Sequence, residues 1–361
     1  MMWMLGARAA FACAGLVHEP LVEAESGSAE VVLELSDAAV LVTYEVVYDG
    51  DASDFGWIVP ATGEVLSVSD GDADLLRELR EVSAPLVIDL TEEDAAGGCG
   101  CGAAKGGDNA SRGGTLGVTV VSEGFTGTYD YVVVHAATAT ELAAWMDERG
   151  YVGADTTDLE HYVSLGADFV LLEVSPDVAG TPEDGRELPP VRLELDTTEA
   201  RFPSVMARHS SMPTQRTTVY VLGEDRATVS GWSTTDLTAV NGSASDDPAT
   251  LLEDELGAIG EGRGFARTWA GAHDGRFLTR FDTLAPRERH DADALFAVGD
   301  GIEPFELHVV LGEADATLDR RGAAAGMLGL LVLVRRRRRQ RTARTMAVDR
   351  QDAARSPTSS I

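Results

Sequence analysis

Cysteine, lysine and long apolar runs are all scarce in this sequence. Three cysteines in 361 residues are too few, and odd in number, for a disulfide scaffold. Lys105 is the only lysine beside 28 arginines, a bias that GC-rich coding explains without any chemistry. The uncharged stretch 322–334 has 13 residues, which is too short to cross a bilayer core by itself. With 44% hydrophobic residues, the chain can still bury one large core or two ordinary ones.

Basic charge is scarce outside the C-terminal end. The formal net charge of the whole chain is −31. Eleven arginines and two acids lie from residue 320 onward, so residues 1–319 hold 18 basic and 58 acidic residues, a net charge of −40. Such a body repels phosphate backbones, and we expect no nucleic-acid partner. Scattered surface carboxylates favour solubility more often than they form a specific cation site.

Catalytic signatures are missing as well. The sequence contains no Gly-x-Ser-x-Gly elbow, no His-Glu-x-x-His helix and no phosphate-binding loop. His161 and the pair His209–Ser210 have the residue types of a hydrolase but stand in no such motif. A lone histidine is usually structural or at the surface. The sequence therefore favours a protein that is not an enzyme, and it predicts no cofactor.

The N-terminus has part of an export signal. Residues 10–12 ("AFA") before Cys13 fit the small-x-small pattern of a signal-peptidase site. The apolar run at 1–6 is shorter than the roughly 7–15 residues of a working signal. We predict a truncated signal peptide at 1–12, and the alternative is an ordinary first strand. Ala10 stands where a lipoprotein signal has a branched aliphatic residue, which disfavours lipidation of Cys13.

The apolar stretch 322–334 lies between arginines near the C-terminus. As a helix it spans roughly 20 Å, against a hydrocarbon core of about 30 Å. Arginine stems can snorkel and lengthen the effective span, and the stretch has no polar face of an interfacial helix. We therefore predict a hydrophobic helix that anchors the chain in a membrane, with its arginine cluster, at 320–339, and a disordered tail at 340–361. The anchor is flanked by Arg320, Arg321, Arg335, Arg336, Arg337, Arg338 and Arg339.

The arginines also predict an orientation. Seven lie between 335 and 344, against two just before the apolar stretch. The positive-inside rule then places the C-terminus in the cytoplasm and the acidic body outside, in the periplasm or at the cell surface. A buried core helix and a polybasic nucleic-acid patch are the alternatives. The tail resembles the C-terminal sorting signals of myxobacterial surface proteins, but no cysteine precedes the apolar stretch and 22 residues follow Arg339, which leaves processing open.

Residues 13–313 are predicted to form a strand-rich α+β domain with several short helices, because strands and helices do not alternate as βαβ units. The segments 217–222 and 227–232 look like a hairpin. The glycine-rich segment 91–114 lacks large apolar side chains and is predicted to be a flexible loop. Helices are expected to start at Asp72, with acids in the first turn, at the N-cap residues Thr138 and Asp247, and at 158–165. Other strands are expected at 31–35, 40–48, 86–90, 116–122, 129–135, 168–174, 191–195, 277–281 and 305–311.

Five pieces of the body follow one another in a recognisable order. They are "ACAG" at 12–15, "YDGDASDFGWIVPA" at 48–61, "GTYDYVVVHAATATELAAWMDERGY" at 127–151, "HYVSLGADFVLLEV" at 161–174 and "RFLTRFDTL" at 276–284. In this order they resemble the bacterial family called domain of unknown function 2330, and "DFGWIVP" is the most specific piece. His18 stands near the place where the family often has a second cysteine, which puts a disulfide of Cys13 in question. The resemblance implies an exported or envelope-associated protein and supplies no reaction.

The aspartates of "DGDASDFG" have the alternating spacing of a calcium loop. In an EF-hand the sixth and twelfth places hold Gly and Glu, whereas here they hold Asp54 and Pro60, so a hairpin turn is the better interpretation. Trp57 and Pro60 are candidates to line a binding groove. A tryptophan on a strand is more often in the core, and Pro60 should end the strand or lie at a sheet edge.

Cys99 and Cys101 are the candidate thiol site. They could contribute to a soft-metal site, but no second pair or nearby histidine cluster completes it. A strained disulfide, a bond to Cys13 and a loose pair without function stay open.

The leading hypothesis is an exported, membrane-tethered binding or structural module with an unidentified envelope partner. The alternative is a thiol- or metal-dependent protein that uses Cys99 and Cys101.

Overall fold

The computed structural model describes residues 15–18, 26–45, 55–90, 117–151, 154–174, 189–208, 211–299 and 301–312. The chain divides into two compact units, Met1–Leu311 and Gly312–Ile361. The predicted signal at 1–12, the loop at 91–114 and the hydrophobic helix and tail at 320–361 lie outside the described residues. Among the residues that are described, no helix has the length and apolar character needed to span a membrane.

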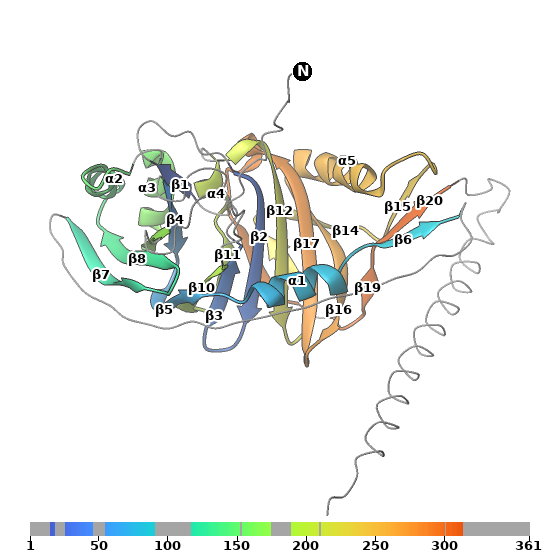
Figure 1. Ribbon diagram of the computed structural model, residues 1–361, viewed down its shortest axis with the longest axis horizontal. Coiled ribbons are helices and arrows are strands. Elements are labelled where there is room, and N and C mark those ends of the chain that lie inside the picture. Colours follow the sequence, from blue (N-terminus) through green and yellow to red (C-terminus); the bar gives the residue numbers. More distant parts are fainter. Residues whose placement is uncertain are drawn as a thin grey trace, which may run out of the picture. The chain divides into compact units, whose positions relative to one another are not determined.

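The first unit is a strand-rich α+β fold, as predicted (Figure 1). Its described helices are α1 (Ala73–Val82), α2 (Ala139–Asp147), α3 (Thr156–Ser164), α4 (Ser204–Ala207) and α5 (Pro248–Glu261), with a 3-10 turn η2 at Arg287–Arg289. Its described strands are β1 (Gly15–His18), β2 (Ser26–Leu35), β3 (Val40–Tyr44), β4 (Phe55–Ala61), β5 (Glu64–Asp70), β6 (Leu86–Asp89), β7 (Val118–Phe125), β8 (Tyr129–Ala136), β9 (Asp168–Val174), β10 (Val191–Asp196), β11 (Ala200–Phe202), β12 (Ser211–Gly223), β13 (Ala227–Ser230), β14 (Ser233–Asp236), β15 (Ala239–Gly242), β16 (Gly264–His273), β17 (Arg276–Pro286), β18 (Ala294–Val298), β19 (Phe305–Glu306) and β20 (His308–Leu311).

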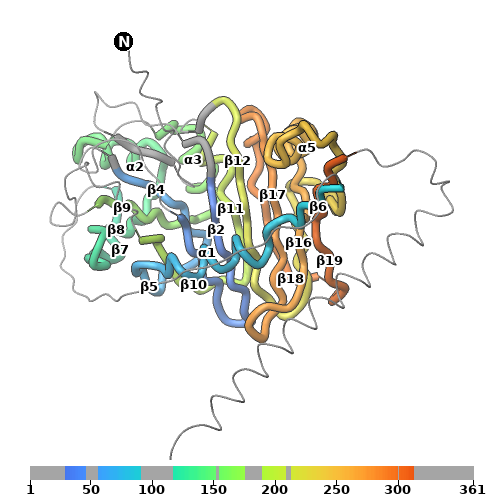
Figure 2. Tube along the Cα trace, turned by 45° about the vertical axis from the view of Figure 1, so that its right-hand side comes forward, coloured from blue at the N-terminus to red at the C-terminus, as the bar shows by residue number. Residues whose placement is uncertain are grey.

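A nine-stranded sheet forms the centre of this unit. Its strand order is β14-β16-β17-β12-β2-β3-β10-β5, and β19 adds to β16. The long strands β12 and β17 run antiparallel, whereas β12 and β2 run parallel although they are far apart in sequence. Figure 2 shows these strands side by side with α1 lying across them. This parallel pairing places β2, which comes early in the chain, in the middle of the sheet.

Alternation along the strands produces two differently covered faces of this sheet. On β2, Val31 and Leu33 point into the main core, and Glu30 and Glu34 lie on the opposite face, as the period of two in a strand requires. The main core lies between this sheet, a five-stranded sheet and a small three-stranded sheet. The opposite face carries α1, whose Leu76 and Leu79 pack with side chains of β2, β12 and β17.

The five-stranded sheet has the order β1-β4-β9-β8-β7 and is antiparallel between neighbours. One of its faces joins the main core, and α2, α3 and α4 pack on the other. Leu142, Trp145 and Met146 are the buried side of α2, in agreement with the face expected from their spacing. These helices therefore form the outer layer of this part of the fold.

Two three-stranded sheets complete the unit. The first, β11-β18-β13, closes the main core, where Trp232, Phe265, Phe281 and Phe296 form a chain of ring contacts. The second, β15-β20-β6, is parallel throughout, and Val240 of its β15 packs with α5.

The expected hairpin at 217–232 is wrong. Its first segment belongs to β12, which pairs with β17 and β2 in the nine-stranded sheet. Its second segment, β13, pairs instead with β18 in a sheet across the main core. The turn after Gly223 therefore carries the chain from one layer to another, and each strand obtains its backbone partner from a distant segment.

Candidate functional site

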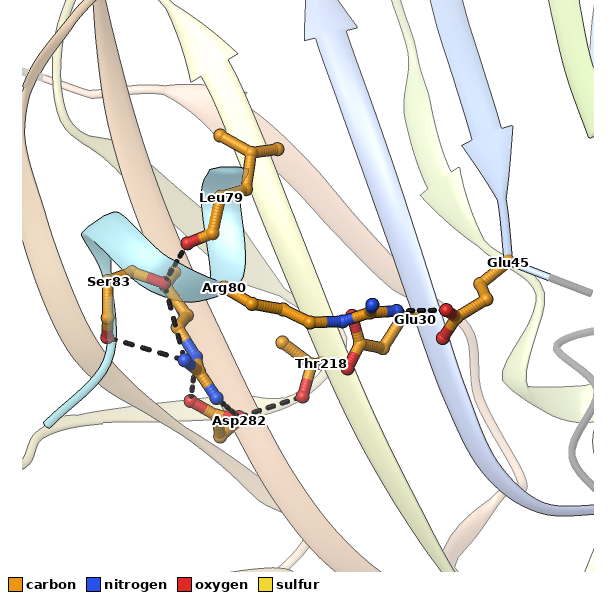
Figure 3. A network of polar contacts seen from close by, with 8 residues as sticks. Glu30, Glu45, Leu79, Arg80, Ser83, Thr218 and Asp282 are labelled. Carbon is orange, nitrogen blue, oxygen red and sulfur yellow. Dashed lines mark hydrogen bonds and ion pairs between the residues drawn. The ribbon is translucent and has the colours of Figure 1, made fainter. Parts of the chain in front are cut away.

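The face of the nine-stranded sheet under α1 carries a network of buried and partly buried charged side chains (Figure 3). We call it the α1 network, and it comprises Glu30, Glu45, Arg80, Ser83, Thr218, Tyr220, Thr268, Arg280 and Asp282. The helix contributes Arg80 and the serine at its C-cap, and the remaining residues come from the sheet or its loops. The network therefore ties α1 to the sheet through polar side chains as well as through Leu76 and Leu79.

Arg80 holds two carboxylates at one end of the network. Its Nε donates to Glu30 at 2.7 Å, and a terminal nitrogen donates to Glu45. Burial raises the pKa of Glu30, Arg80 lowers it and the neighbouring Glu45 raises it again, so the net direction is upward. One guanidinium thus pairs with two carboxylates, and the surroundings of Glu30 disfavour its ionised form.

Arg280 and Asp282 form the other end. Nε of Arg280 lies 2.8 Å from Asp282, and both partners are almost fully buried. Asp282 also accepts from Thr218 at 2.8 Å and from Thr268 at 2.7 Å. Burial alone would raise the pKa of Asp282, but the charge and hydrogen bonds of Arg280 outweigh it and lower that pKa. This carboxylate is saturated with donors, so it acts as a fixed structural anion.

Tyr220 lies between the two ends. Its ring centroid is 5.6 Å from the guanidinium carbon of Arg280, and its buried hydroxyl has no hydrogen-bond partner among the described residues. Burial raises the pKa of Tyr220. The neutral phenol therefore fills the space beneath α1 and presents no reactive oxygen to solvent.

A second group of buried polar residues surrounds Asp293, and we call it the Asp293 cluster. It comprises Asp158, His161, Tyr162, Arg201, Ser204, Arg208, His290 and Asp293. Asp293 accepts from the hydroxyl of Tyr162 at 2.7 Å, from Arg201 at 2.8 Å and from the backbone N–H of Val205 at 3.1 Å. These bonds join α3, β11 and α4 to the segment before β18, so Asp293 holds several layers together.

The Asp293 cluster has the residue types of a hydrolase without its geometry. Nε2 of His161 lies 3.5 Å from Asp293 and forms no hydrogen bond among the described residues. Ser204 is 0% exposed, and its hydroxyl also has no partner there. A nucleophile must reach its substrate and a base must reach the nucleophile. The arrangement therefore serves to position elements, with burial and Asp293 holding the pKa of Tyr162 well above its usual range.

Within this cluster, His290 lies against the ring of Trp232, at a centroid distance of 5.8 Å. The side chain is almost completely buried, and its Nδ1 has no hydrogen-bond partner in the described part of the chain. Burial lowers the pKa of His290 to about 4, and the nearby charge of Arg208 acts in the same direction. His290 is thus a neutral core histidine at physiological pH.

The candidate site residues from the sequence lie in separate places. Trp57 is 5% exposed and packs in the main core 5.8 Å from the ring of Tyr129, and Pro60 is buried near the end of β4. The β1 strand pairs with β4 only as far as Ile58, so Pro60 lies where β9 is the described neighbour. This burial is what the core interpretation expects, and the groove stays a prediction.

The other candidates lie outside the described residues. These are Cys99 and Cys101, the calcium-like spacing at 49–54, His209–Ser210 and the anchor arginines. Among the residues with described positions, no group of three or more histidines, cysteines and acids could hold a metal ion.

Sequence reasoning missed both buried groups. Their members come from segments that are up to about 250 residues apart, such as Glu30 with Arg280 and Tyr162 with Asp293. One usable signal was present: "RFD" at 280–282 places an arginine and an aspartate in a strand that also contains Phe277, Leu278, Phe281 and Leu284. A buried strand with a charge calls for a partner, but the sequence does not say which one.

Comparison with known proteins adds a family and little else. No curated protein matches the chain. The crystal structure of a mutated baculovirus P35 after caspase cleavage covers 78% of this chain and 99% of its own, at 6% identity and a TM-score of 0.28, which is too low to support an argument. The family described as an uncharacterized protein conserved in bacteria, DUF2330, matches residues 7–293. Because that match takes in well over half of the chain, the protein belongs to the DUF2330 family.

Proposed function

We propose that this protein is exported and held at the membrane by residues 320–339, with its acidic body outside the cytoplasm as a binding or structural module. The observation that carries the proposal is the charge asymmetry across the apolar stretch 322–334. Seven arginines lie between 335 and 344, directly after that stretch, and a body, 1–319, with a net charge of −40 precedes it. Positive charge is retained on the cytoplasmic side, which favours an external body.

The construction of the body supports a scaffold role. Ion pairs connect elements that are distant in sequence, as Arg80 with Glu30 in the α1 network and Arg201 with Asp293 in the Asp293 cluster. On the same sheet face, Glu34 accepts from Arg192 at 2.9 Å and from Arg276 at 2.7 Å. Buried charges with several partners hold one arrangement of the layers in place. Recognition would then use the surface of a rigid body.

Carbonate extraction of cell membranes tests the tether. The full chain should stay in the membrane pellet, whereas a chain that stops after Asp319 should move to the soluble fraction. A chain that lacks only 340–361 is the matched control and should stay in the pellet. Extraction of the full chain to the same extent as the chain ending at Asp319 would contradict the proposal.

The second candidate is a thiol- or metal-dependent protein, and it rests on Cys99 and Cys101, one residue apart. Elemental analysis of the full chain purified under reducing conditions distinguishes a metal-dependent protein from the membrane-tethered module. Stoichiometric zinc, copper or iron that is lost in the Cys99→Ser, Cys101→Ser variant would favour this candidate over a module without metal.

A further inference from the structure

The small parallel sheet β15-β20-β6 presents apolar side chains that it does not bury. Val240, Val309 and Val87 share one row and one face, and the first two are buried while Val87 on the outer strand is 48% exposed. The opposite face has Leu86, Ile88 and Val310 half-buried, and Leu90, just after β6, is 53% exposed. We call Leu86, Ile88, Leu90 and Val310 the β6 face.

The β6 face lies where the described chain ends. The backbone N–H of Leu90 donates to the carbonyl of Leu311 at 2.9 Å, and Gly312 is the next residue. Because the three strands are parallel, their C-terminal ends meet at the same edge of the sheet. The edge that carries Leu90 is therefore the edge from which the chain continues toward the predicted anchor.

The length of the connecting segment limits how far this edge can be from the membrane. Nine residues, 313–321, separate Gly312 from the apolar stretch that starts at 322. A fully extended chain advances at most about 3.3–3.6 Å per residue, so the reach is about 30 Å. If residues 320–339 insert as proposed, the edge at Gly312 is confined to within that distance of the bilayer.

We propose that the β6 face rests on the lipid surface of the membrane that holds the anchor. This inference rests on the proposed function, since it requires residues 320–339 to insert. The exposed Leu90 and the half-buried Leu86 and Ile88 gain by leaving water at the acyl boundary, and the short tether limits how far this face can move from the bilayer. The acidic body makes an anionic headgroup an unfavourable partner, so the contact depends on apolar side chains rather than on charge.

Environment-sensitive fluorophores on single cysteines test the contact in the full chain. The background carries Cys13→Ser, Cys99→Ser and Cys101→Ser, and the probes are attached at Ile88→Cys and Leu90→Cys. The controls are Leu66→Cys on β5 and Val121→Cys on β7, which are 51% and 47% exposed and so match Leu90 at 53%. Figures 1 and 2 show β5 and β7 on the opposite side of the unit from β6. Circular dichroism verifies that each variant is folded.

The labelled proteins are reconstituted in vesicles of phosphatidylethanolamine and phosphatidylglycerol, with and without nitroxide-labelled lipid. We expect a blue shift and loss of most fluorescence to the nitroxide at 88 and 90, and little change at 66 and 121. If the protein stays on the vesicles after carbonate treatment but all four probes behave alike, the proposed lipid contact of the β6 face is wrong, and the proposed membrane anchor is still supported. If carbonate releases the protein, both proposals fail. A blue shift at 88 and 90 without nitroxide quenching, together with cross-linked dimers, would assign the face to a second copy and overturn the lipid contact.

Discussion

Charged side chains beneath α1 and around Asp293 each have a defined partner. The number of hydrogen-bond donors per carboxylate, and with it the direction of the pKa shift, differs from one carboxylate to the next. Asp282 has four donor contacts and a lowered pKa, whereas Glu30 shares one guanidinium with Glu45 and has a raised pKa. Removing one partner of a buried ion pair leaves an uncompensated charge, which is more destabilising than replacing both partners with apolar residues. Single substitutions within the α1 network should therefore differ strongly in their effect on the free energy of unfolding.

Arg80 should matter more than Glu30. Arg80→Met leaves two carboxylates facing each other, and we expect a loss of about 1–2 kcal/mol in the free energy of unfolding, discounted because the arginine is partly exposed. Glu30→Gln keeps an acceptor and removes the strained charge, so its effect should stay within about 0.5 kcal/mol. Urea unfolding at neutral pH measures both, and the double variant should recover part of the loss. Equal losses in the two single variants would contradict this account of the pair.

His290 should make the protein sensitive to acid. Its pKa is about 4 in the folded state against an ordinary 6.5, so the unfolded chain takes up the proton first. The contribution of the neutral histidine is complete above pH 6.5 and is lost as the pH falls toward 4, on the order of 3 kcal/mol in all. His290→Gln cannot charge in this window, so the difference in stability between the variant and the parent should shift by that amount. A difference that is constant from pH 7 to pH 4 would show that His290 is not a buried neutral group.

At the scale of elements, local chemistry was enough to predict the starts of α1, α2 and α5. Asp72, Thr138 and Asp247 each accept from a backbone N–H in the first turn, and Glu141 completes the capping box with Thr138. The hairpin at 217–232 failed because adjacent strands were assumed to pair, whereas β12 and β13 obtain their partners from β2, β17 and β18. Strand pairing is decided by burial across the whole core, which a local window does not contain.

The packing of α5 on β17 gives a matched test at this scale. A Cβ at Gly260 would lie 2.0 Å from the carbonyl oxygen of Leu284, whereas one at Gly257 would meet only a methyl of Leu284 at 3.9 Å. Gly260→Ala should destabilise the protein by about 1–3 kcal/mol, because the helix must move off the strand. Gly257→Ala should stabilise it by about 0.5–1 kcal/mol, since alanine favours the helix. Thermal unfolding compares the two, and stabilisation by both would mean that α5 lies farther from β17.

At the scale of the whole molecule, the sequence was sufficient for the family and the fold class. It was insufficient for the Asp293 cluster, where Asp293 meets Tyr162 from 131 residues away and Arg201 from 92 residues away. No spacing rule links such residues before the layers have assembled. The predicted membrane anchor, by contrast, rests on a local signal, which is the composition of one short segment near the C-terminus.

The arginine cluster should set orientation and should not bind DNA. Replacing Arg335, Arg336, Arg337, Arg338 and Arg339 with glutamine removes most of the positive charge that follows the apolar stretch. Each such charge contributes about 1 kcal/mol at an anionic leaflet, so membrane partition should fall sharply while the body stays folded. Membrane partition of the variant and a gel-shift titration of the parent with DNA measure the two alternatives. Unchanged partition together with tight, salt-sensitive DNA binding would reverse the interpretation.

Protease treatment of intact spheroplasts tests the central claim most directly. The body, 13–313, is expected to be digested without lysis, while an epitope placed after Ile361 survives on a short fragment that contains 320–339. A cytoplasmic marker protein must remain intact in the same sample. If the body resists the protease until the cells are lysed, it lies in the cytoplasm, and the proposed export and orientation are both wrong.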